Sequence, residues 1–292
     1  MAMRKLLLQL DSSRLPSVFD CVVAYDAAAD EVLSYGDVKE SDVRDLVHGC
    51  IFTRGPKDLK NTAVFIGGAD MAAGERLLAA ARKAFFPPFM VSLMLDSNGS
   101  NTTAVAAVAK MLQAAGDVRG KRAVVVAGTG PVGLRAAGLL AKAGAEVLIT
   151  SRKADAGERA RDLVTQRFGG TVRSAPLATS DDAARALDGA TLVLNAGPAG
   201  VQLVPKSAWA GRAGLKVAAD VNAVPPLGIE GIDAMDDGMM KGGVICFGAL
   251  AIGNLKMKVH KACIARMFER NDLVLDAETI ADVARELRTP KP

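Results

Sequence analysis

The stretch that decides the fold is residues 122–150, which read RAVVVAGTGPVGLRAAGLLAKAGAEVLIT. A short Val-rich apolar run of strand length occupies 122–127, and a glycine-rich turn follows it. Residues 134–144 are rich in Ala and Leu and have helical composition, and a second apolar run fills 145–150. A strand, a glycine turn, a helix and a second strand in this order predict a βαβ unit with two parallel strands.

The glycine turn has the spacing GxGxxG, in which each glycine has its own task. Gly128 is expected to make the tight turn, Gly130 to let the backbone approach a pyrophosphate, and Gly133 to let helix and strand pack closely. The amino end of the following helix would present unpaired N–H groups to an anion. A turn that binds nothing is the weaker interpretation, because three spaced glycines disfavour the start of a helix. The predicted dinucleotide site comprises Gly128, Thr129, Gly130, Pro131, Val132 and Gly133.

The end of the second strand indicates which dinucleotide binds. An NAD site usually has Asp or Glu about 20 residues after the glycines, where it holds the ribose 2′-hydroxyl. This chain has Ser151, Arg152 and Lys153 there instead. A carboxylate would repel a 2′-phosphate, whereas Arg can bind it in a bidentate fashion and Lys adds charge. The alternative is a solvated basic turn, but the missing acid and the two bases favour NADP.

Two further strands of this unit end in small polar residues. The apolar run 191–194 leads into Asn195-Ala196-Gly197, and the run 216–219 leads into Asp220-Val221-Asn222. The carboxyl ends of parallel strands meet at one edge of a sheet, so both turns should lie beside the glycine turn. Candidates to face the ribose and nicotinamide are Asn195, Ala196, Gly197, Asp220 and Asn222.

Charge and composition exclude several classes of protein. The net charge is only +4 and aromatic residues make up 4%, so we expect no nucleic-acid surface. No run reaches the roughly 18 apolar residues of a membrane span, and the first residues lack the pattern of a signal peptide. The only histidines are His48 and His260 and no CxxC pair occurs, so no metal site is expected. We expect a cytoplasmic protein with reduced, mostly buried thiols at Cys21, Cys50, Cys246 and Cys263.

Residues 1–96 alternate apolar strand-like runs with helical stretches. This alternation predicts a separate α/β domain with its own parallel sheet. The expected strands are 5–10, 32–35, 51–53, 62–66 and 89–95, and the expected helices are 16–29, 41–47 and 71–86. Later in the chain we expect strands at 171–174, 191–194 and 216–219, and helices at 101–115, 154–168, 181–187, 248–270 and 276–287.

A polar stretch, DSNGSNTT at 96–103, follows the expected strand 89–95. One interpretation is an ordinary turn in which Ser100 caps the next helix. The other is a polar pocket wall, because open α/β sheets bind ligands at the carboxyl ends of their strands. The residues alone favour neither.

The sequence resembles the bacterial NADP-dependent methylene-tetrahydromethanopterin dehydrogenases, the one-carbon enzymes of methylotrophs, over nearly its whole length. Six segments carry the similarity: PSVFD at 16–20, FIGGADMAAGER at 65–76, MLDSNGSNTT at 94–103, AGTGPVG at 127–133, PPLGIEGID at 225–233 and FGAL at 247–250. The longer segments are specific to the family, whereas AGTGPVG alone would not be.

The resemblance implies a two-domain α/β protein with a cleft between the domains. Residues 1–100 and 255–292 would form the pterin-binding domain, and 101–254 the Rossmann domain for NADP. It also implies a homo-oligomer, a dimer or trimer, in which hydride passes from the methylene carbon of the pterin to nicotinamide. Some members of the family also accept methylene-tetrahydrofolate.

The resemblance also suggests where the substrate binds. It implies a pterin site comprising Ser17, Phe19, Asp20, Asp70, Asp96, Ser97, Asn98, Gly99, Ser100, Thr102, Thr103 and Lys256. It adds Gly248 and Ala249 to the cofactor candidates. Removing hydride from a carbon between two nitrogens leaves a stabilised cation and moves no proton, so the reaction needs no general base. Asp20 and Asp96 are candidates to stabilise that cation, and Lys256 could contact the pterin. The alternative roles are a helix cap or a turn bond for the two carboxylates and a solvated position for the lysine.

Two other functions stay open at this point. A methylene-tetrahydrofolate dehydrogenase/cyclohydrolase would use a Tyr-xxx-Lys motif on a helix. Tyr35 and Lys39 have that spacing, but Gly36 and Asp37 between them favour a turn, so we expect no cyclohydrolase activity. A non-catalytic, NADP-sensing protein is the third possibility, because a Rossmann unit alone does not imply turnover.

Overall fold

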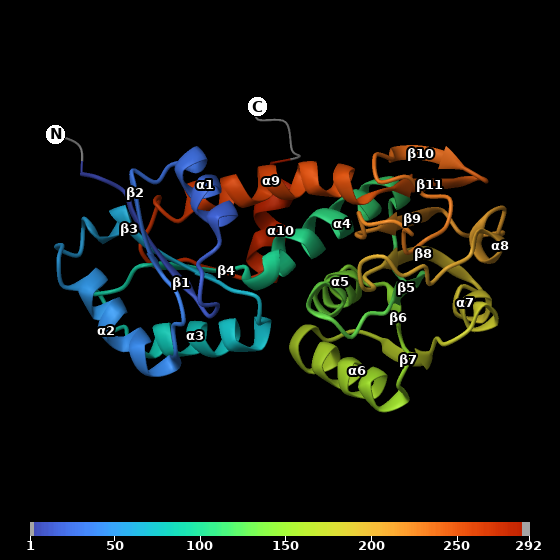
Figure 1. Ribbon diagram of the computed structural model, residues 1–292, viewed down its shortest axis with the longest axis horizontal. Coiled ribbons are helices and arrows are strands. Elements are labelled where there is room, and N and C mark those ends of the chain that lie inside the picture. The colour runs from blue at the N-terminus through green and yellow to red at the C-terminus, as the bar shows by residue number, and fades with distance from the viewer. Residues whose placement is uncertain (1–2, 288–292) are drawn as a thin grey trace. The chain divides into compact units, whose positions relative to one another are not determined.

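The computed structural model describes residues 3–287 and divides into two compact units. Unit 1 comprises Met1–Thr102 and Met257–Pro292, and unit 2 comprises Thr103–Lys256. The chain passes between the units inside two helices, α4 (Ser100–Ala115) and α9 (Ala249–Arg266) (Figure 1). Both units are α/β with largely parallel sheets, so the predicted two-domain α/β fold class is confirmed.

Unit 1 contains a five-stranded, fully parallel sheet with the order β12-β4-β3-β1-β2. The strands are β1 (Leu6–Asp11), β2 (Glu31–Tyr35), β3 (Thr62–Gly67), β4 (Ser92–Leu95) and β12 (Val274–Leu275). The helices are α1 (Val18–Ala27), α2 (Glu40–Ile51), α3 (Met71–Lys83) and α10 (Ala277–Glu286), with short 3-10 turns η1 (Leu59–Asn61) and η2 (Ser97–Gly99). In register, Asp11 pairs with Gly67 and Ile66 with Leu95, so three strands end at one edge.

The helices of unit 1 begin at polar caps that the sequence supplies. Ser17 caps α1 and Asp70 caps α3, each by accepting bonds from backbone N–H groups of the first turn. Helix α2 buries Val43, Val47 and Ile51, and these side chains pack into a core with the strands and α3. Burial of one helix face against the sheet holds these elements together.

Unit 2 contains a seven-stranded sheet with the order β10-β11-β9-β8-β5-β6-β7. Only the edge strand β10 is antiparallel to its neighbour, and β5 lies between β8 and β6, as in doubly wound dinucleotide-binding folds. The strands are β5 (Arg122–Val126), β6 (Glu146–Ser151), β7 (Val172–Pro176), β8 (Ala190–Asn195), β9 (Val217–Asp220), β10 (Asp237–Lys241) and β11 (Val244–Phe247). The helices are α5 (Pro131–Lys142), α6 (Ala154–Phe168), α7 (Ser180–Ala186) and α8 (Lys206–Trp209).

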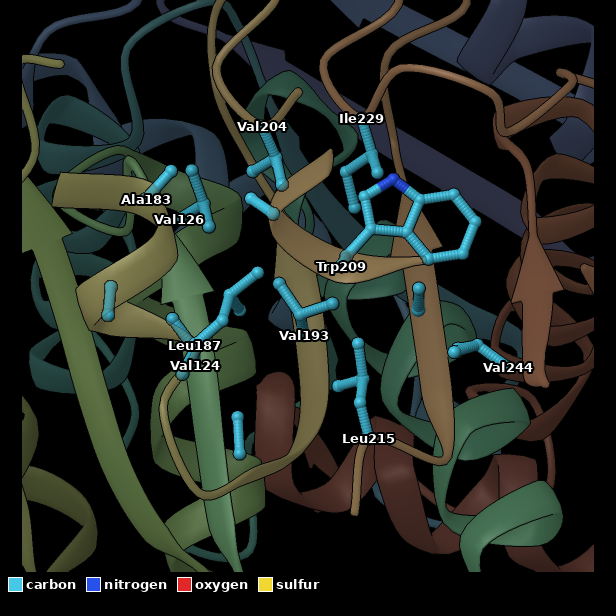
Figure 2. Packing of buried hydrophobic residues seen from close by; sticks show 14 of the residues in the cluster. Val124, Val126, Ala183, Leu187, Val193, Val204, Trp209, Leu215, Ile229 and Val244 are labelled. Carbon is cyan, nitrogen blue, oxygen red and sulfur yellow. The ribbon is translucent and has the colours of Figure 1, made fainter. Parts of the chain in front are cut away.

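The single tryptophan anchors one face of this sheet. Trp209 is fully buried and packs in a cluster with Val193 of β8, Leu215 and Val244 of β11 (Figure 2). Its indole N–H donates to the carbonyl of Glu230 at 2.9 Å, so the polar atom is satisfied. Through this residue the core ties the loop after β9 to the sheet.

Two local predictions were wrong. The strand expected at 51–53 does not form, because Ile51 is the last residue of α2 and continues its buried stripe. The helix expected to end at Val47 is therefore one turn longer. The antiparallel strand β10, DGMMK, was not predicted because all of its residues but the last are exposed and it has no apolar alternation.

Candidate functional site

The glycine turn of unit 2 leads from β5 into α5, and the close packing predicted at Gly133 is present. A Cβ on Gly133 would lie 2.5 Å from the Cα of Gly128, so helix and strand approach too closely for any side chain there. The left-handed residue of the turn is Ala127, with φ of 51°, rather than Gly128. Gly130 precedes α5 with φ of −82°, and no atom of residues 3–287 outside its own neighbours lies within 4 Å of where its Cβ would be. The room above Gly130 fits the close approach of a phosphate group to the helix start.

The end of β6 presents two bases to solvent. Ser151 is buried, and its hydroxyl accepts a bond from the backbone N–H of Lys153 at 3.3 Å. The side chains of Arg152 and Lys153 are exposed. The first carboxylate after them, Asp155, forms an ion pair with Arg159 at 2.8 Å, and this pairing lowers the pKa of Asp155. Asp155 also interacts electrostatically with Lys153, although its hydrogen-bonded partner is Arg159. The two bases lie at the end of β6, next to the strand that leads into the glycine turn.

The ends of β8 and β9 are joined by buried side chains. Asn195 and Asp220 are partners in register, and the amide Nδ2 of Asn195 donates to Oδ1 of Asp220 at 2.7 Å. The backbone N–H of Asn222 donates to the same oxygen at 2.9 Å, and the N–H of Ile229 donates to Oδ2 at 2.8 Å. Burial raises the pKa of the Asp220 carboxyl above its usual value, and these donors oppose the rise. The structure thus brings together the two turns that the sequence places at this edge.

Gly248 and Ala249 lie where α9 begins. A Cβ on Gly248 would meet the carbonyl oxygen of Asp233 at 2.0 Å, so only glycine fits. The backbone N–H of Gly248 donates to the carbonyl of Asp236 at 2.8 Å. The bond and the close approach fix the loop that precedes β10.

At the carboxyl edge of unit 1, short bonds link the loops that follow neighbouring strands. The hydroxyl of Ser13 accepts from the N–H of Ala69 at 3.0 Å, and its carbonyl accepts from the N–H of Asp37 at 2.9 Å. The hydroxyl of Ser97 donates to the carbonyl of Gly67 at 2.8 Å. The loops after β1, β2, β3 and β4 therefore form one connected surface.

A buried carboxylate at this edge, Asp11, was not among the predicted site residues. It is 1% exposed, and it accepts from the N–H of Ser13 at 2.7 Å and of Ser17 at 3.1 Å. Oδ2 of Asp11 and Oδ2 of Asp20 lie 3.4 Å and 3.7 Å from the point that a Cβ on Gly67 would occupy. The two carboxylates thus flank one spot at the end of β3. An acid that closes an apolar strand, LLLQLD, was the signal that could have identified Asp11.

The polar stretch after β4 is mostly folded inward. Asp96 is 2% exposed, and its two oxygens accept from the N–H and the hydroxyl of Thr102 at 2.9 and 2.6 Å. Ser100 is also buried and donates to the carbonyl of Ser97 at 2.7 Å. Only Asn98, with φ of 55°, is fully exposed in this turn. The stretch forms a turn, but the predicted cap at Ser100 is wrong, because Ser100 is the first residue of α4 and Asp96 accepts from the N–H of Thr102. A pterin contact from this stretch stays a prediction.

The remaining pterin candidates of unit 1 differ in exposure. Phe19 is 48% exposed, and its ring lies 6.4 Å from that of His260, which stacks on Phe65 at 5.5 Å. Asp70 is exposed and caps α3 through bonds from Ala72 and Ala73. The edge therefore combines aromatic rings with the carboxylates of Asp11 and Asp20.

Thr103 and Lys256 are the first and last residues of unit 2. Both are half-buried, Thr103 on α4 and Lys256 on α9. Their roles toward a pterin stay predictions.

The two residues with the Tyr-xxx-Lys spacing lie on either side of a turn. Tyr35 ends β2 and Lys39 precedes α2, with Asp37 at φ of 53° between them, so this pair lies in a turn as predicted. Within residues 3–287, no group of three or more His, Cys, Asp or Glu side chains could hold a metal ion. No helix in the same range is long and apolar enough to cross a membrane. The four cysteines are free, and all but Cys21 are buried.

Known proteins resemble this chain both locally and along its length. A family model described as the N-terminal part of methylene-tetrahydromethanopterin dehydrogenase matches residues 18–98. The "Bifunctional protein MdtA" of Methylorubrum extorquens is 52% identical over 287 residues, covering 97% of this chain and 99% of that protein. An "NAD(P)-dependent methylenetetrahydromethanopterin dehydrogenase" of the same organism is 34% identical over 295 residues, again covering 97% of this chain and 99% of that protein.

Solved structures with low sequence identity share the fold. A shikimate 5-dehydrogenase from Listeria monocytogenes aligns with a TM-score of 0.56 at 12% identity, covering 98% of this chain and 96% of that one. The 5-ketofructose reductase of a Gluconobacter strain aligns with a TM-score of 0.51 at 18% identity, covering 98% and 99%. At these identities the likeness concerns the fold alone.

Proposed function

Because the chain belongs to the methylene-tetrahydromethanopterin dehydrogenase family, we propose that it oxidises methylene-tetrahydromethanopterin to the methenyl form with NADP. The observation that carries the proposal is similarity along nearly the whole chain to a relative named for this reaction with NAD(P). The proposal includes a cytoplasmic homo-oligomer, a dimer or trimer, that works in formaldehyde oxidation and one-carbon metabolism.

Unit 2 fits NADP by the space and the charges it offers. The open position above Gly130 leaves room for a pyrophosphate beside the first N–H groups of α5. Arg152 and Lys153 are exposed where a 2′-phosphate would lie, and Ser151 can donate its hydroxyl. We assign the cofactor to this edge, with the turns after β8 and β9 and the residues Gly248 and Ala249 as its further walls.

When bound, the nicotinamide ring accepts a hydride at C4, and the protein's task is to orient two rings and exclude water. Loss of hydride leaves positive charge on the pterin carbon between two nitrogens. A carboxylate near that carbon stabilises the charge as it develops. We assign this role to Asp20, whose carboxylate lies close to the same position beside Gly67 as the buried side chain of Asp11. No group has to remove a proton.

We place the pterin at the carboxyl edge of unit 1, where the loops after its strands are bonded together. The residues assigned to it are Ser17, Phe19, Asp20, Asp70, Asp96, Ser97, Asn98, Gly99, Ser100, Thr102 and Thr103, and Lys256 of α9 stays a further candidate. Buried Asp96, Ser100 and Thr102 would act by holding the turn, while Phe19 and Asn98 have the exposed surface that a ligand could contact.

A second substrate, methylene-tetrahydrofolate, is favoured by one observation. The relative with 52% identity is named a bifunctional protein. The two pterins share the reacting ring, so one site can perform the same hydride step on both. The turn at Tyr35 and Lys39 supports the expectation that no cyclohydrolase activity accompanies it.

The test is a spectrophotometric assay of NADPH formation with the two methylene pterins in parallel. Turnover with methylene-tetrahydromethanopterin, at the higher kcat/KM, supports the proposal. A preference for methylene-tetrahydrofolate would mean that the protein performs the same hydride transfer in folate-linked one-carbon metabolism. Tight NADP binding without turnover of either pterin would contradict the enzyme assignment and support an NADP sensor.

A further inference from the structure

The buried pair Asn195 and Asp220 sits where the ends of β8 and β9 meet. Both side chains are 0% exposed, although they lie at the edge where a ligand is expected. A Cβ on Gly228 would fall 1.8 Å from Nδ2 of Asn195, so only glycine lets the loop after β9 come this close. The carbonyl of Gly228 in turn accepts from the N–H groups of Leu203 and Val204, which follow β8. The pair therefore fastens two loops to each other.

Protein donors occupy both oxygens of Asp220. Oδ1 accepts from Asn195 and from the N–H of Asn222, and Oδ2 accepts from the N–H of Ile229. A carboxylate without exposed surface has no atom through which it could touch a dinucleotide. Its effect on a ligand must pass through the groups that it holds.

Asn195 connects Asp220 to the turn 195–197, which lies next to the glycine loop. With Nδ2 committed to Asp220, its Oδ1 accepts from the N–H of Gly197 at 3.2 Å and fixes the turn 195–197. The N–H of Ala196 donates to the carbonyl of Val126, at the end of β5, at 3.0 Å. A Cβ on Gly197 would lie 3.5 Å from that of Ala127. The turn held by the pair thus borders the first turn of the glycine loop.

The topology assigns these loops to one half of the dinucleotide. In a doubly wound sheet the pyrophosphate lies over the central strand, and the two nucleosides lie to either side of it. Arg152 and Lys153 follow β6, on one side of β5, whereas β8 and β9 lie on the other. If the two bases hold the adenosine 2′-phosphate, the loops fastened by Asp220 face the nicotinamide nucleoside.

We propose that Asp220 is a positioning residue that, through Asn195, holds the loops 195–198 and 222–229 against the nicotinamide half of NADP without touching it. This inference rests on the proposed use of NADP. It assigns to Asp220 an indirect role in place of the direct contact that its position at the strand end suggests.

Asp220→Asn is the informative substitution, because it keeps the size and removes one acceptor. Every neighbour of the carboxylate is a donor, so an amide NH₂ must face either Asn195 and Asn222 or Ile229. The donors that face the amide NH₂ then lose their hydrogen bonds to residue 220, and their loop is no longer held in place. If this variant does not fold, Asn195→Ala breaks the same link and leaves Asp220 with its two backbone donors.

The measurements are calorimetric Kd values for 2′,5′-ADP and for NADP, and kcat with methylene-tetrahydromethanopterin, all on the full chain. Binding of 2′,5′-ADP, which lacks the nicotinamide half, should stay within about twofold of wild type because it uses the distant side of β5. The extra affinity of NADP over 2′,5′-ADP should shrink, and kcat should fall by about 10- to 100-fold, as expected for a misplaced reacting ring.

Asp276→Ala is the matched control for general loss of stability. Asp276 caps α10 in unit 1 through bonds from Glu278 and Thr279, so its loss should lower Tm with kcat unchanged. Equal weakening of 2′,5′-ADP and NADP by Asp220→Asn would overturn the inference in favour of a purely structural role. Unchanged NADP affinity and kcat would also overturn it. Failure of the wild-type chain to bind NADP would instead count against the proposed function.

Discussion

The Cα of Gly128 occupies the space into which any side chain at Gly133 would project, 2.5 Å from the position of its Cβ. Gly130, three residues earlier, has open space above it and an ordinary φ of −82°. Two glycines of one motif are thus required for different reasons. Gly133 serves the packing of α5 on β5, and Gly130 leaves room for a ligand.

Gly130→Val should leave the fold intact and weaken NADP binding by more than about 100-fold, or about 2.7 kcal/mol, because the side chain fills the phosphate position. Gly133→Ala should instead lower the free energy of unfolding by about 1–3 kcal/mol through overpacking. Urea unfolding and NADP titration of both variants separate the two effects. Retained NADP affinity in Gly130→Val would mean that the loop does not hold the pyrophosphate.

Replacing both bases after β6, in the variant Arg152→Ala with Lys153→Ala, should weaken NADP binding by at least about 100-fold, since charged hydrogen bonds contribute about 1.5–3 kcal/mol each. NAD lacks the 2′-phosphate, so its affinity should change little. Both side chains are exposed, and the fold should be unaffected. Titration of the variant with each dinucleotide provides the comparison. An equal loss of NAD and NADP affinity would contradict the assignment of the 2′-phosphate.

Asp20→Asn should lower kcat by about 10-fold or more while KM for the pterin changes less, because the carboxylate acts on charge that develops in the transition state. Asp45→Asn on α2 is the control, because Asp45 is exposed and its carboxylate pairs with the neighbouring Arg44. Steady-state kinetics of both variants provide the test. A rise in KM alone would make Asp20 a binding residue rather than a stabiliser of the cation.

The acid limb of the stability curve should depend on Asp182, which accepts from the N–H groups of Ala178 and Thr179 at 2.9 Å. The bond from Ala178, the side chain of Thr179 and the bond from its N–H together lower the pKa of Asp182 from 3.8 to about 2. A lowered pKa in the folded state gives stability that is present above pH 3.8 and is lost as the pH falls toward 2. In urea unfolding, the free energy of unfolding of Asp182→Asn should therefore fall less steeply with decreasing pH over this range than that of wild type. Identical slopes would show that Asp182 titrates normally.

The thiols should differ in reactivity as their burial differs. Burial raises the pKa of Cys50 and of Cys246 to about 11 and also raises that of Cys263. Cys21 is only partly buried. Since the thiolate is the reactive form, iodoacetamide at pH 8 should modify Cys21 first, and the other three only after unfolding. Peptide mass spectrometry gives the order of modification, and early labelling of Cys263 in the native protein would contradict it.

Local sequence was sufficient for features whose cause is local. The spacing of Gly128, Gly130 and Gly133 reports a turn within one βαβ unit, and the structure contains that turn. Val43, Val47 and Ile51 share one helix face, a pattern that could have extended α2 to its true end. The two-residue strand β12 is too short to have a pattern of its own.

Contacts between distant parts of the chain were beyond the reach of sequence patterns. The sequence places Asn195 and Asp220 at strand ends, but their mutual bond spans 25 residues and depends on the pairing of β8 with β9. Likewise, Asp11 lies beside Gly67 because of the register of β1 against β3, and α1 brings Asp20 close to the same place. Strand order therefore determines which candidate side chains bond to each other and which remain for a ligand.

The order of the strands in unit 1 also determines the order in which a ribosome can complete the protein. Strand β12 pairs with β4 through Val274 and Leu93, yet the whole of unit 2 is translated between them. Until residue 274 leaves the exit tunnel, the edge of β4 has no partner from its own chain, and an open edge invites pairing with another nascent chain. Unit 2 is contiguous and can fold as it emerges, whereas unit 1 begins first and closes last. Chaperone demand during synthesis should therefore fall on unit 1.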